Sequence, residues 1–278
     1  MLYLVLAILS SSCISVVMRL SSGKLRSNTG MLAANYVVCS LLSALYGGFR
    51  LLPVGESGLG LALGIGGVNG VLFLVNFVLL QHCTAKNGIV LSSIFMKLGL
   101  LVPIAVSVLL FGELPTLLQG IGFVLAVFAI VLINYEKGTG IGGVKGGLLL
   151  LLLCGGAADT MCKLFEELGS AALSEHFLLY TFGVALLLCL VLLRRRGESI
   201  GGAEALWGTL LAVPNFFSAK FLLRSLSALP AVIAYPSYSV GTILVVTVSG
   251  LLLFGEKLKK RQWVALGIIL AALILLNI

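Results

Sequence analysis

The sequence predicts an all-α membrane protein in which ten transmembrane helices form two inverted five-helix repeats. Three observations support this prediction: a very apolar composition, ten apolar segments of helix length, and a pattern that recurs once along the chain. Of the 278 residues, 60% are hydrophobic and 10% are charged, and the mean hydropathy is +1.18. Soluble domains carry about a quarter charged residues, so a chain of this composition requires lipid as its main solvent.

Ten apolar segments account for most of the chain. Each is near the ~20 residues that an α-helix needs to cross the hydrocarbon core, without the strict alternation of barrel strands. The first is expected to be a span and not a signal peptide, because no basic segment or cleavage signal accompanies it. The chain also lacks the phosphate-binding loop of an attached ATPase. We expect spans at 2–20, 30–48, 58–80, 88–111, 115–134, 146–165, 174–193, 203–226, 229–254 and 261–277.

The chain has a net charge of +8, and the positions of its basic residues indicate how the spans are oriented in the membrane. Basic residues follow the odd-numbered spans, and the opposite connections carry little positive charge beyond Arg50. Because positive residues mark cytoplasmic connections, we expect a multi-pass protein of the cell membrane with both termini outside. This role of the charges indicates no nucleic-acid partner. The residues concerned are Lys24, Arg26, Lys86, Lys137, Lys145, Arg194, Arg195, Arg196, Lys257, Lys259, Lys260 and Arg261.

One sequence pattern occurs twice. The segment LLFGELPTLLQ at 109–119 returns as LLFGEKLKKRQ at 252–262, an offset of 143 residues that also pairs Asn134 with Asn277. We therefore expect one five-helix repeat at 1–137 and a second at 144–278. An odd number of spans per copy inserts the second copy upside down, which is a design used by alternating-access transporters.

These features resemble the drug/metabolite transporter superfamily, in its EamA-like branch. The resemblance rests on the five plus five spans, the Phe-Gly-Glu turn before spans five and ten, and the segment LPAVIAYPSYSVGTIL at 229–244. It implies ten helices around a central cavity, with spans five and ten as scaffold or dimer contact, in a monomer or homodimer. It also implies secondary transport of small organic solutes. Such transporters usually place both termini in the cytoplasm, so the charge pattern of this chain departs from the resemblance.

The glutamates of the Phe-Gly-Glu turns are interpreted as helix caps. Glu113 precedes Pro115 at the start of the fifth span, and Glu256 stands equivalently before the tenth. A carboxylate at a helix N-terminus meets free N–H groups and the positive end of the helix dipole.

Polar side chains inside the spans are the candidate substrate-binding groups. Asp159 and Lys163 lie four residues apart on one helix face, in the favourable order for an ion pair. At ~1.5 Å per residue, Lys97 and Asp159 lie roughly 15 and 20 Å from the basic side, and therefore close enough in depth to pair. Lys163 and Lys220 lie deeper, near 26 Å. The candidates are Asn76, Lys97, Asp159, Lys163, Asn215, Lys220, Tyr235 and Tyr238.

Other roles for these residues remain open. Lys97 and Asp159 could form a permanent structural pair, Lys163 and Arg224 could extend to the lipid headgroups, and the tyrosines could belong to an interfacial belt. Within the spans, cations outnumber Asp159, so a small anionic or zwitterionic metabolite is the expected solute. The alternatives are an exporter of cationic drugs or quaternary amines, and an uncoupled facilitator or channel. No zinc pair, nucleophile elbow or C-x-x-C motif occurs, so neither an enzyme, a cofactor nor a metal is predicted.

A double-mutant experiment tests the predicted Lys97–Asp159 pair. Either single alanine substitution leaves an unpaired buried charge, which typically costs ~3–5 kcal/mol in soluble proteins. The double variant should be more stable than either single variant and still inactive in transport. Additive losses of stability would show that the two groups do not touch, and a fully active double variant would place the site elsewhere.

Overall fold

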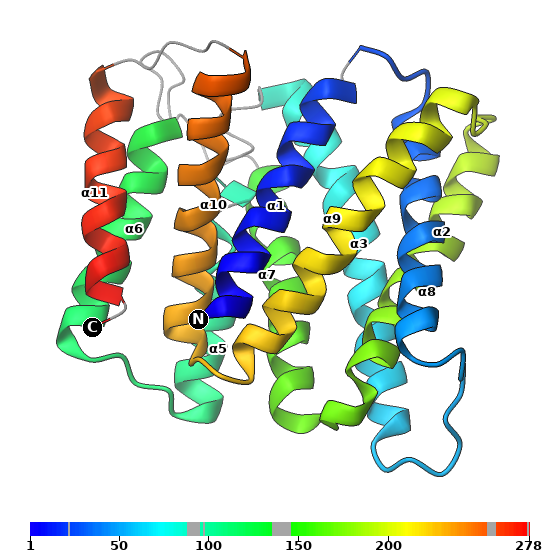
Figure 1. The fold of residues 1–278 in the computed structure, drawn as a ribbon, viewed down its shortest axis with the longest axis horizontal. Helices are drawn as coiled ribbons and strands as arrows, with labels where there is room; N and C mark the ends of the chain where they lie inside the picture. Colours follow the sequence, from blue (N-terminus) through cyan, green and yellow to red (C-terminus); the bar gives the residue numbers. More distant parts are fainter. Residues whose placement is uncertain (22, 88–94, 97, 135–145, 255–259, 277) are drawn as a thin grey trace. The chain divides into compact units, whose positions relative to one another are not determined.

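The computed structural model describes residues 1–21, 23–87, 95–96, 98–134, 146–254, 260–276 and 278. In these ranges the regular structure is helical, with no strand (Figure 1). This confirms the predicted all-α fold. The helices are α1 (Leu2–Ser21), α2 (Asn28–Tyr46), α3 (Leu59–Asn87), α5 (Leu101–Phe111), α6 (Leu117–Asn134), α7 (Gly146–Leu168), α8 (Ser174–Arg195), α9 (Gly202–Leu226), α10 (Ala231–Phe254) and α11 (Lys260–Leu276), with a short 3-10 turn, η1, at Ala171–Leu173.

Seven segments of the described chain are long and apolar enough to cross a membrane. They are Leu2–Ser21, Asn28–Tyr46, Leu59–Leu80, Gly146–Leu168, Ala171–Arg195, Gly202–Leu226 and Ala231–Leu253. Three shorter apolar helices accompany them, at Leu101–Phe111, Leu117–Ala129 and Leu266–Leu276. These ten segments overlap the ten predicted spans one for one. Residues 88–94 and Lys97, in the fourth predicted span, lie outside the described residues.

The third predicted span, 58–80, agrees with the apolar segment Leu59–Leu80. Helix α3 itself continues to Asn87, because a helix bonds its own backbone and need not stop where its apolar segment stops. Helix α6 begins at Leu117, two residues after the predicted start at residue 115. A capping box sets this start: Gln119 N donates to Thr116 Oγ1 at 3.2 Å, and Thr116 N donates to Gln119 Oε1 at 3.0 Å.

The helices form two compact units, each drawn from both halves of the chain. The first unit comprises residues 1–74 and 161–227, and the second comprises 75–160 and 228–278, so α3 and α7 contribute to both. In the first unit α9 packs along α1 and α2, and α2 also packs on α8. In the second, α6 packs along α11 (Figure 1), and α10 contacts α5, α6 and α11. The proposed internal repeat of 1–137 and 144–278 stays a prediction.

Glycines let α3 approach α8 closely in the first unit. A Cβ built on Gly66 would lie 2.9 Å from the carbonyl oxygen of Phe177, and one on Gly70 would lie 2.5 Å from that of Thr181. Small residues four apart commonly bring transmembrane helices together in this way. Asn69 adds a polar contact, since its Nδ2 donates to Thr181 Oγ1 at 3.4 Å. The α3–α8 contact therefore combines close backbone approach with a hydrogen bond.

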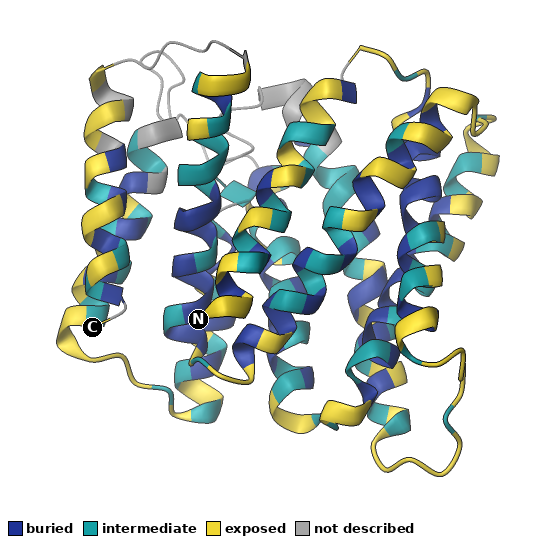
Figure 2. Ribbon diagram, in the orientation of Figure 1, coloured by how far each residue is buried: buried dark blue, intermediate teal, exposed yellow. Residues whose placement is uncertain are grey.

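Burial differs between helices (Figure 2). In α2 and α10, 56% of the residues in the most apolar window are buried, compared with 22% in α1. Helix α1 exposes apolar side chains such as Leu2, Val5 and Leu9, as expected for a helix whose neighbour is lipid. The buried Glu204 of α9 holds the connection before α2, because its Oε1 accepts hydrogen bonds from the N–H groups of Arg26 and Ser27 at 2.7 and 3.2 Å.

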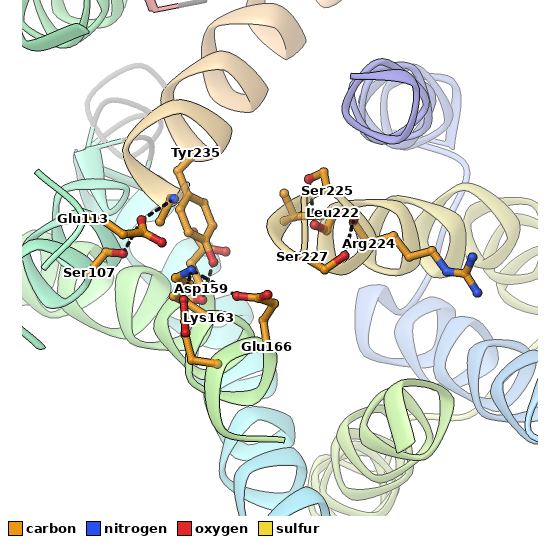
Figure 3. Close-up of polar contacts among 12 residues, drawn as sticks. Ser107, Glu113, Asp159, Lys163, Glu166, Leu222, Arg224, Ser225, Ser227 and Tyr235 are labelled. Carbon is orange, nitrogen blue, oxygen red and sulfur yellow. Dashed lines mark hydrogen bonds and ion pairs between the residues drawn. The ribbon is translucent and has the colours of Figure 1, made fainter. Parts of the chain in front are cut away.

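Glu113 holds the start of α10 in the second unit (Figure 3). Its Oε2 accepts from the N–H of Ala231 at 2.6 Å and from Ser107 Oγ of α5 at 2.6 Å. The carboxylate therefore supplies an acceptor for one of the N–H groups that a helix start leaves unbonded. Glu113 thus caps a helix, as predicted, but this helix is α10 and not α6, because the chain turns after Phe111 through Gly112 at φ 67°. Glu256 lies outside the described residues.

Substitution of Gly70 tests the close α3–α8 contact. Gly70→Ala should lower the free energy of unfolding by ~1–3 kcal/mol, as over-packing does in protein cores. The readout is the thermal unfolding midpoint of the purified protein in detergent. Gly64→Ala is the matched control on the same helix, because a Cβ there meets nothing within 4 Å. Equal midpoints for the two variants would contradict the close approach.

Substitution of Glu113 tests the cap of α10. Glu113→Ala leaves the Ala231 N–H without this acceptor, and we expect a loss of ~1–3 kcal/mol. Glu113→Gln keeps one acceptor oxygen and should lose less. Thr116→Ala removes the cap of α6, so its effect should add to that of Glu113→Ala if the two residues cap different helices. Strong non-additivity in thermal unfolding would instead assign both residues to one cap.

Candidate functional site

The eight side chains predicted to bind substrate fall into three groups. Lys163, Asn215 and Lys220 belong to the first unit, and Asn76, Asp159, Tyr235 and Tyr238 belong to the second. Lys97 lies outside the described residues, so its pairing with Asp159 stays a prediction.

Lys220 is the centre of a polar cluster in the first unit. Its Nζ lies 2.6 Å from Oε1 of Glu175, and the two side chains are only 10% and 17% exposed. The same ammonium lies 3.4 Å from the ring centroid of Tyr46 and 5.5 Å from that of Phe216. The negative face of an aromatic ring attracts a cation. Lys220 is therefore stabilised by one carboxylate and by an aromatic face.

Three helix ends bring this cluster together. Tyr46 is the last residue of α2, Glu175 lies in the first turn of α8, and Lys220 lies near the end of α9. The first turn of a helix is the favourable place for a carboxylate, because the helix dipole is positive there. The position of Glu175 therefore follows from the preference of a helix start for a carboxylate, and its contact with Lys220 follows from the packing of α2, α8 and α9.

Two side-chain atoms in the first turn of α8 have no hydrogen-bond partner within the described part of the chain. They are Oε2 of Glu175 and Nδ1 of His176, and both are buried. The other ring nitrogen, Nε2 of His176, lies 2.7 Å from the carbonyl oxygen of Arg50. A carbonyl only accepts, so Nε2 carries the proton, and Nδ1 presents a lone pair in the neutral ring. The start of α8 therefore offers two unfilled acceptors.

Lys163 is neutralised within its own helix. Its Nζ lies 3.0 Å from Oε2 of Glu166 (Figure 3) and 2.6 Å from Oε1 of Glu167, and its side chain is 2% exposed. The expected surplus of cations is therefore wrong for Lys163 and Lys220. Helix α7 continues to Leu168, beyond the predicted end of its span at residue 165, and this extension brings Glu166 and Glu167 onto the face of Lys163.

In the second unit, a tyrosine joins α10 to α7. The hydroxyl of Tyr235 donates to the backbone oxygen of Asp159 at 2.6 Å (Figure 3), and Tyr235 is 1% exposed. Tyr238, beyond Pro236, is half-buried. Asn76 lies against α7, since a Cβ on Gly155 would lie 3.4 Å from its Oδ1, which is buried without a partner among the described residues.

Asn215 lies in the contact between α9 and α2, where its Nδ2 donates to Oδ1 of Asn35 at 3.3 Å.

The sequence analysis did not identify Tyr46 and Glu175 as partners of Lys220. The predicted span ends could have indicated these partners. The second predicted span ends at 48, the seventh begins at 174 and the eighth ends at 226. All three ends belong to the same side of the membrane, and Tyr46, Glu175 and Lys220 each lie within about two turns of them.

Comparison with known proteins relates part of the chain to a transporter family. A model of the EamA-like transporter family matches residues 145–278. An uncharacterized protein of Haemophilus influenzae is 27% identical over 207 residues, which cover 72% of this chain and 69% of the relative. One crystal structure shares the fold with a TM-score of 0.74 at 13% identity, over 99% of this chain and 94% of that one. The predicted resemblance is thereby confirmed for residues 145–278, which match the EamA-like transporter family. Together with the apolar helices, this match indicates a multi-pass membrane protein.

Proposed function

We propose that this protein is a secondary transporter of a small polar organic metabolite, anionic or zwitterionic, in the cell membrane. It works by alternating access, driven by a gradient or by exchange. The observation that carries the solute class is the Lys220–Glu175 ion pair, which is enclosed, rests against an aromatic ring and leaves one carboxylate oxygen unfilled.

The pair is suited to exchange of partners. Lys220 has a single carboxylate from another helix as its ion-pair partner, whereas Lys163 contacts two carboxylates of its own helix. A solute carboxylate could replace Glu175 at Lys220 while the Tyr46 ring stays in contact. A zwitterion could also place an N–H donor on Oε2 of Glu175, where no donor of the described chain is bound. The preference for an anion or zwitterion therefore rests on one exchangeable lysine.

The second unit supplies further proposed contacts. Lys97 and Asp159 remain the proposed anchor at the middle of the membrane, and Asn76 of α3 and Tyr235 and Tyr238 of α10 are the other proposed contacts. The buried, unfilled oxygen of Asn76 accepts N–H or O–H donors, which a polar metabolite carries.

One observation favours a cationic drug or quaternary amine as the alternative solute. Tyr46, Phe216 and Phe217 form an aromatic cluster, with ring centroids 5.3 to 6.1 Å apart. Such clusters bind quaternary ammonium groups. The Lys220 ammonium already lies over Tyr46, and a second cation there would be repelled. The anionic or zwitterionic solute is therefore the primary proposal.

Ligand-induced stabilisation of the purified protein tests the solute class. The panel contains dicarboxylates, amino acids and quaternary amines, and a ligand at 100 times its Kd stabilises by ~2.7 kcal/mol. We expect stabilisation by a carboxylate-bearing compound, its loss in Lys220→Met, and its retention in the control Lys260→Met, an exposed lysine at the start of α11.

Two further measurements complete this test. Lys220→Met paired with Glu175→Gln avoids an unpaired buried carboxylate and should fold, so loss of binding there reports on the ion pair and not on misfolding. Counterflow of the stabilising compound in proteoliposomes then separates a carrier from an uncoupled channel. Stabilisation by quaternary amines alone, or by anions equally in the Lys220 variants, would contradict the proposed solute class.

A further inference from the structure

We infer that a groove between α1 and α9 binds an anionic phospholipid, with one acyl chain along the groove and the phosphate at Arg224. All of the residues concerned belong to the first unit. The lipid site is separate from the solute contact proposed at Lys220. The phospholipid is a partner that the protein holds, not the solute that it carries.

The groove is apolar and has the size of a ligand site. Its volume is about 730 Å³, within the range of ~300–1,000 Å³ that small-molecule sites occupy. Among the ten described residues that line it, only Ser10 and Thr209 carry a side-chain oxygen. Leu9, Leu210 and Val213 line it and are 46%, 48% and 47% exposed. A small polar metabolite would find few hydrogen-bond partners here, whereas a hydrocarbon chain needs none.

The groove has the length of one acyl chain. Its lining runs from Thr209 to Phe221 on α9 and from Leu9 to Val17 on α1, and the two helices pack along each other (Figure 1). At ~1.5 Å per residue these stretches are roughly 18 and 12 Å long. Half of the ~30 Å hydrocarbon core is roughly 15 Å, which is the depth that the acyl chains of one leaflet fill. One acyl chain therefore fits along the groove.

A series of aromatic contacts joins the groove to Arg224. The ring of Phe221 stacks on that of Phe217 at 5.5 Å and on that of Tyr3 at 6.2 Å, measured between centroids. The guanidinium carbon of Arg224 lies 5.7 Å from the Tyr3 centroid, and Nη1 of Arg224 donates to the Tyr3 hydroxyl at 3.5 Å. Arg224 therefore lies at the end of the groove that Phe221 lines.

Arg224 supplies the charge that complements a phosphate. It is exposed, and within the described chain it contacts the neutral hydroxyl of Tyr3 and forms no ion pair with a carboxylate. A guanidinium is planar and binds phosphate through two parallel N–H bonds, whereas an ammonium acts as a point charge. A zwitterionic phospholipid carries a cation beside its phosphate, which offsets the attraction to Arg224. The cation and the apolar groove together therefore match an anionic phospholipid.

Native mass spectrometry of the full-length protein in detergent tests the inference, with dioleoyl phosphatidylglycerol as the probe and dioleoyl phosphatidylcholine as the comparison. The wild type should bind one phosphatidylglycerol more tightly than phosphatidylcholine. Arg224→Gln should weaken this binding about tenfold or more, because hydrogen bonds to a charged group are lost. Arg224→Lys should recover only part of the affinity. Lys24→Gln is the matched control, because Lys24 lies over the ring of Trp207 outside the groove, and it should bind like the wild type.

Filling the groove provides the second measurement. Val213→Trp places a large ring in the groove and should abolish the tight binding. Leu206→Trp is its control, because Leu206 is 59% exposed on the same helix but does not line the groove. Both positions are exposed, so both variants should keep the unfolding midpoint of the wild type.

Four results would overturn the inference. Equal binding of the two lipids, or unchanged phosphatidylglycerol binding in Arg224→Gln, would reject the headgroup contact. Unchanged binding in Val213→Trp would reject the groove. Competition by free glycerol phosphate at the affinity of the lipid would show that the acyl chain contributes nothing. A wild-type dimer that Val213→Trp separates would make the groove a contact between two copies of the chain. These measurements use no transported solute, so failure of the proposed function would be seen separately in the ligand panel.

Discussion

The absence of hydrogen-bond partners in the lipid hydrocarbon is the constraint on which the rest of this structure depends. Each backbone or charged group in that layer must be satisfied by the protein. Helices meet this requirement for the backbone, except at their first N–H groups. Glu113 supplies such an acceptor at the start of α10, and Glu204 does so for the connection before α2. The half-buried Glu113 and the buried Glu204 therefore hold helix ends against their neighbours.

The same constraint explains how the helices pack. Lipid is as apolar as the helix surfaces, so association depends on close van der Waals contact and on a few interhelical hydrogen bonds. Gly66 and Gly70 provide the close contact between α3 and α8, and Asn69 provides the hydrogen bond. Asn215 and Asn35 provide one between α9 and α2. Polar residues inside the spans thus serve packing as well as solute binding.

The two described lysines inside the spans form two different kinds of ion pair, one within a helix and one between helices. Lys163 is held by two glutamates one turn away on α7, a local arrangement that tertiary packing does not alter. Lys220 depends on a glutamate from another helix and on the ring of Tyr46. A pair formed across helices can open when a solute replaces one partner, which is why the proposed solute contact is placed there.

The sequence by itself determined the all-α class and the approximate position of each span, because apolar length is a local property of the chain. It also placed Lys163 and Lys220 within their spans, since depth follows from residue counts. Only the tertiary structure decided their surroundings. Hydropathy places a residue along the membrane normal, but it does not define the rotation of its helix or the neighbouring helix, because lipid is equally apolar on every side. The partner of Lys220 therefore came from the first turn of α8, and that of Glu113 from a residue 118 positions along the chain.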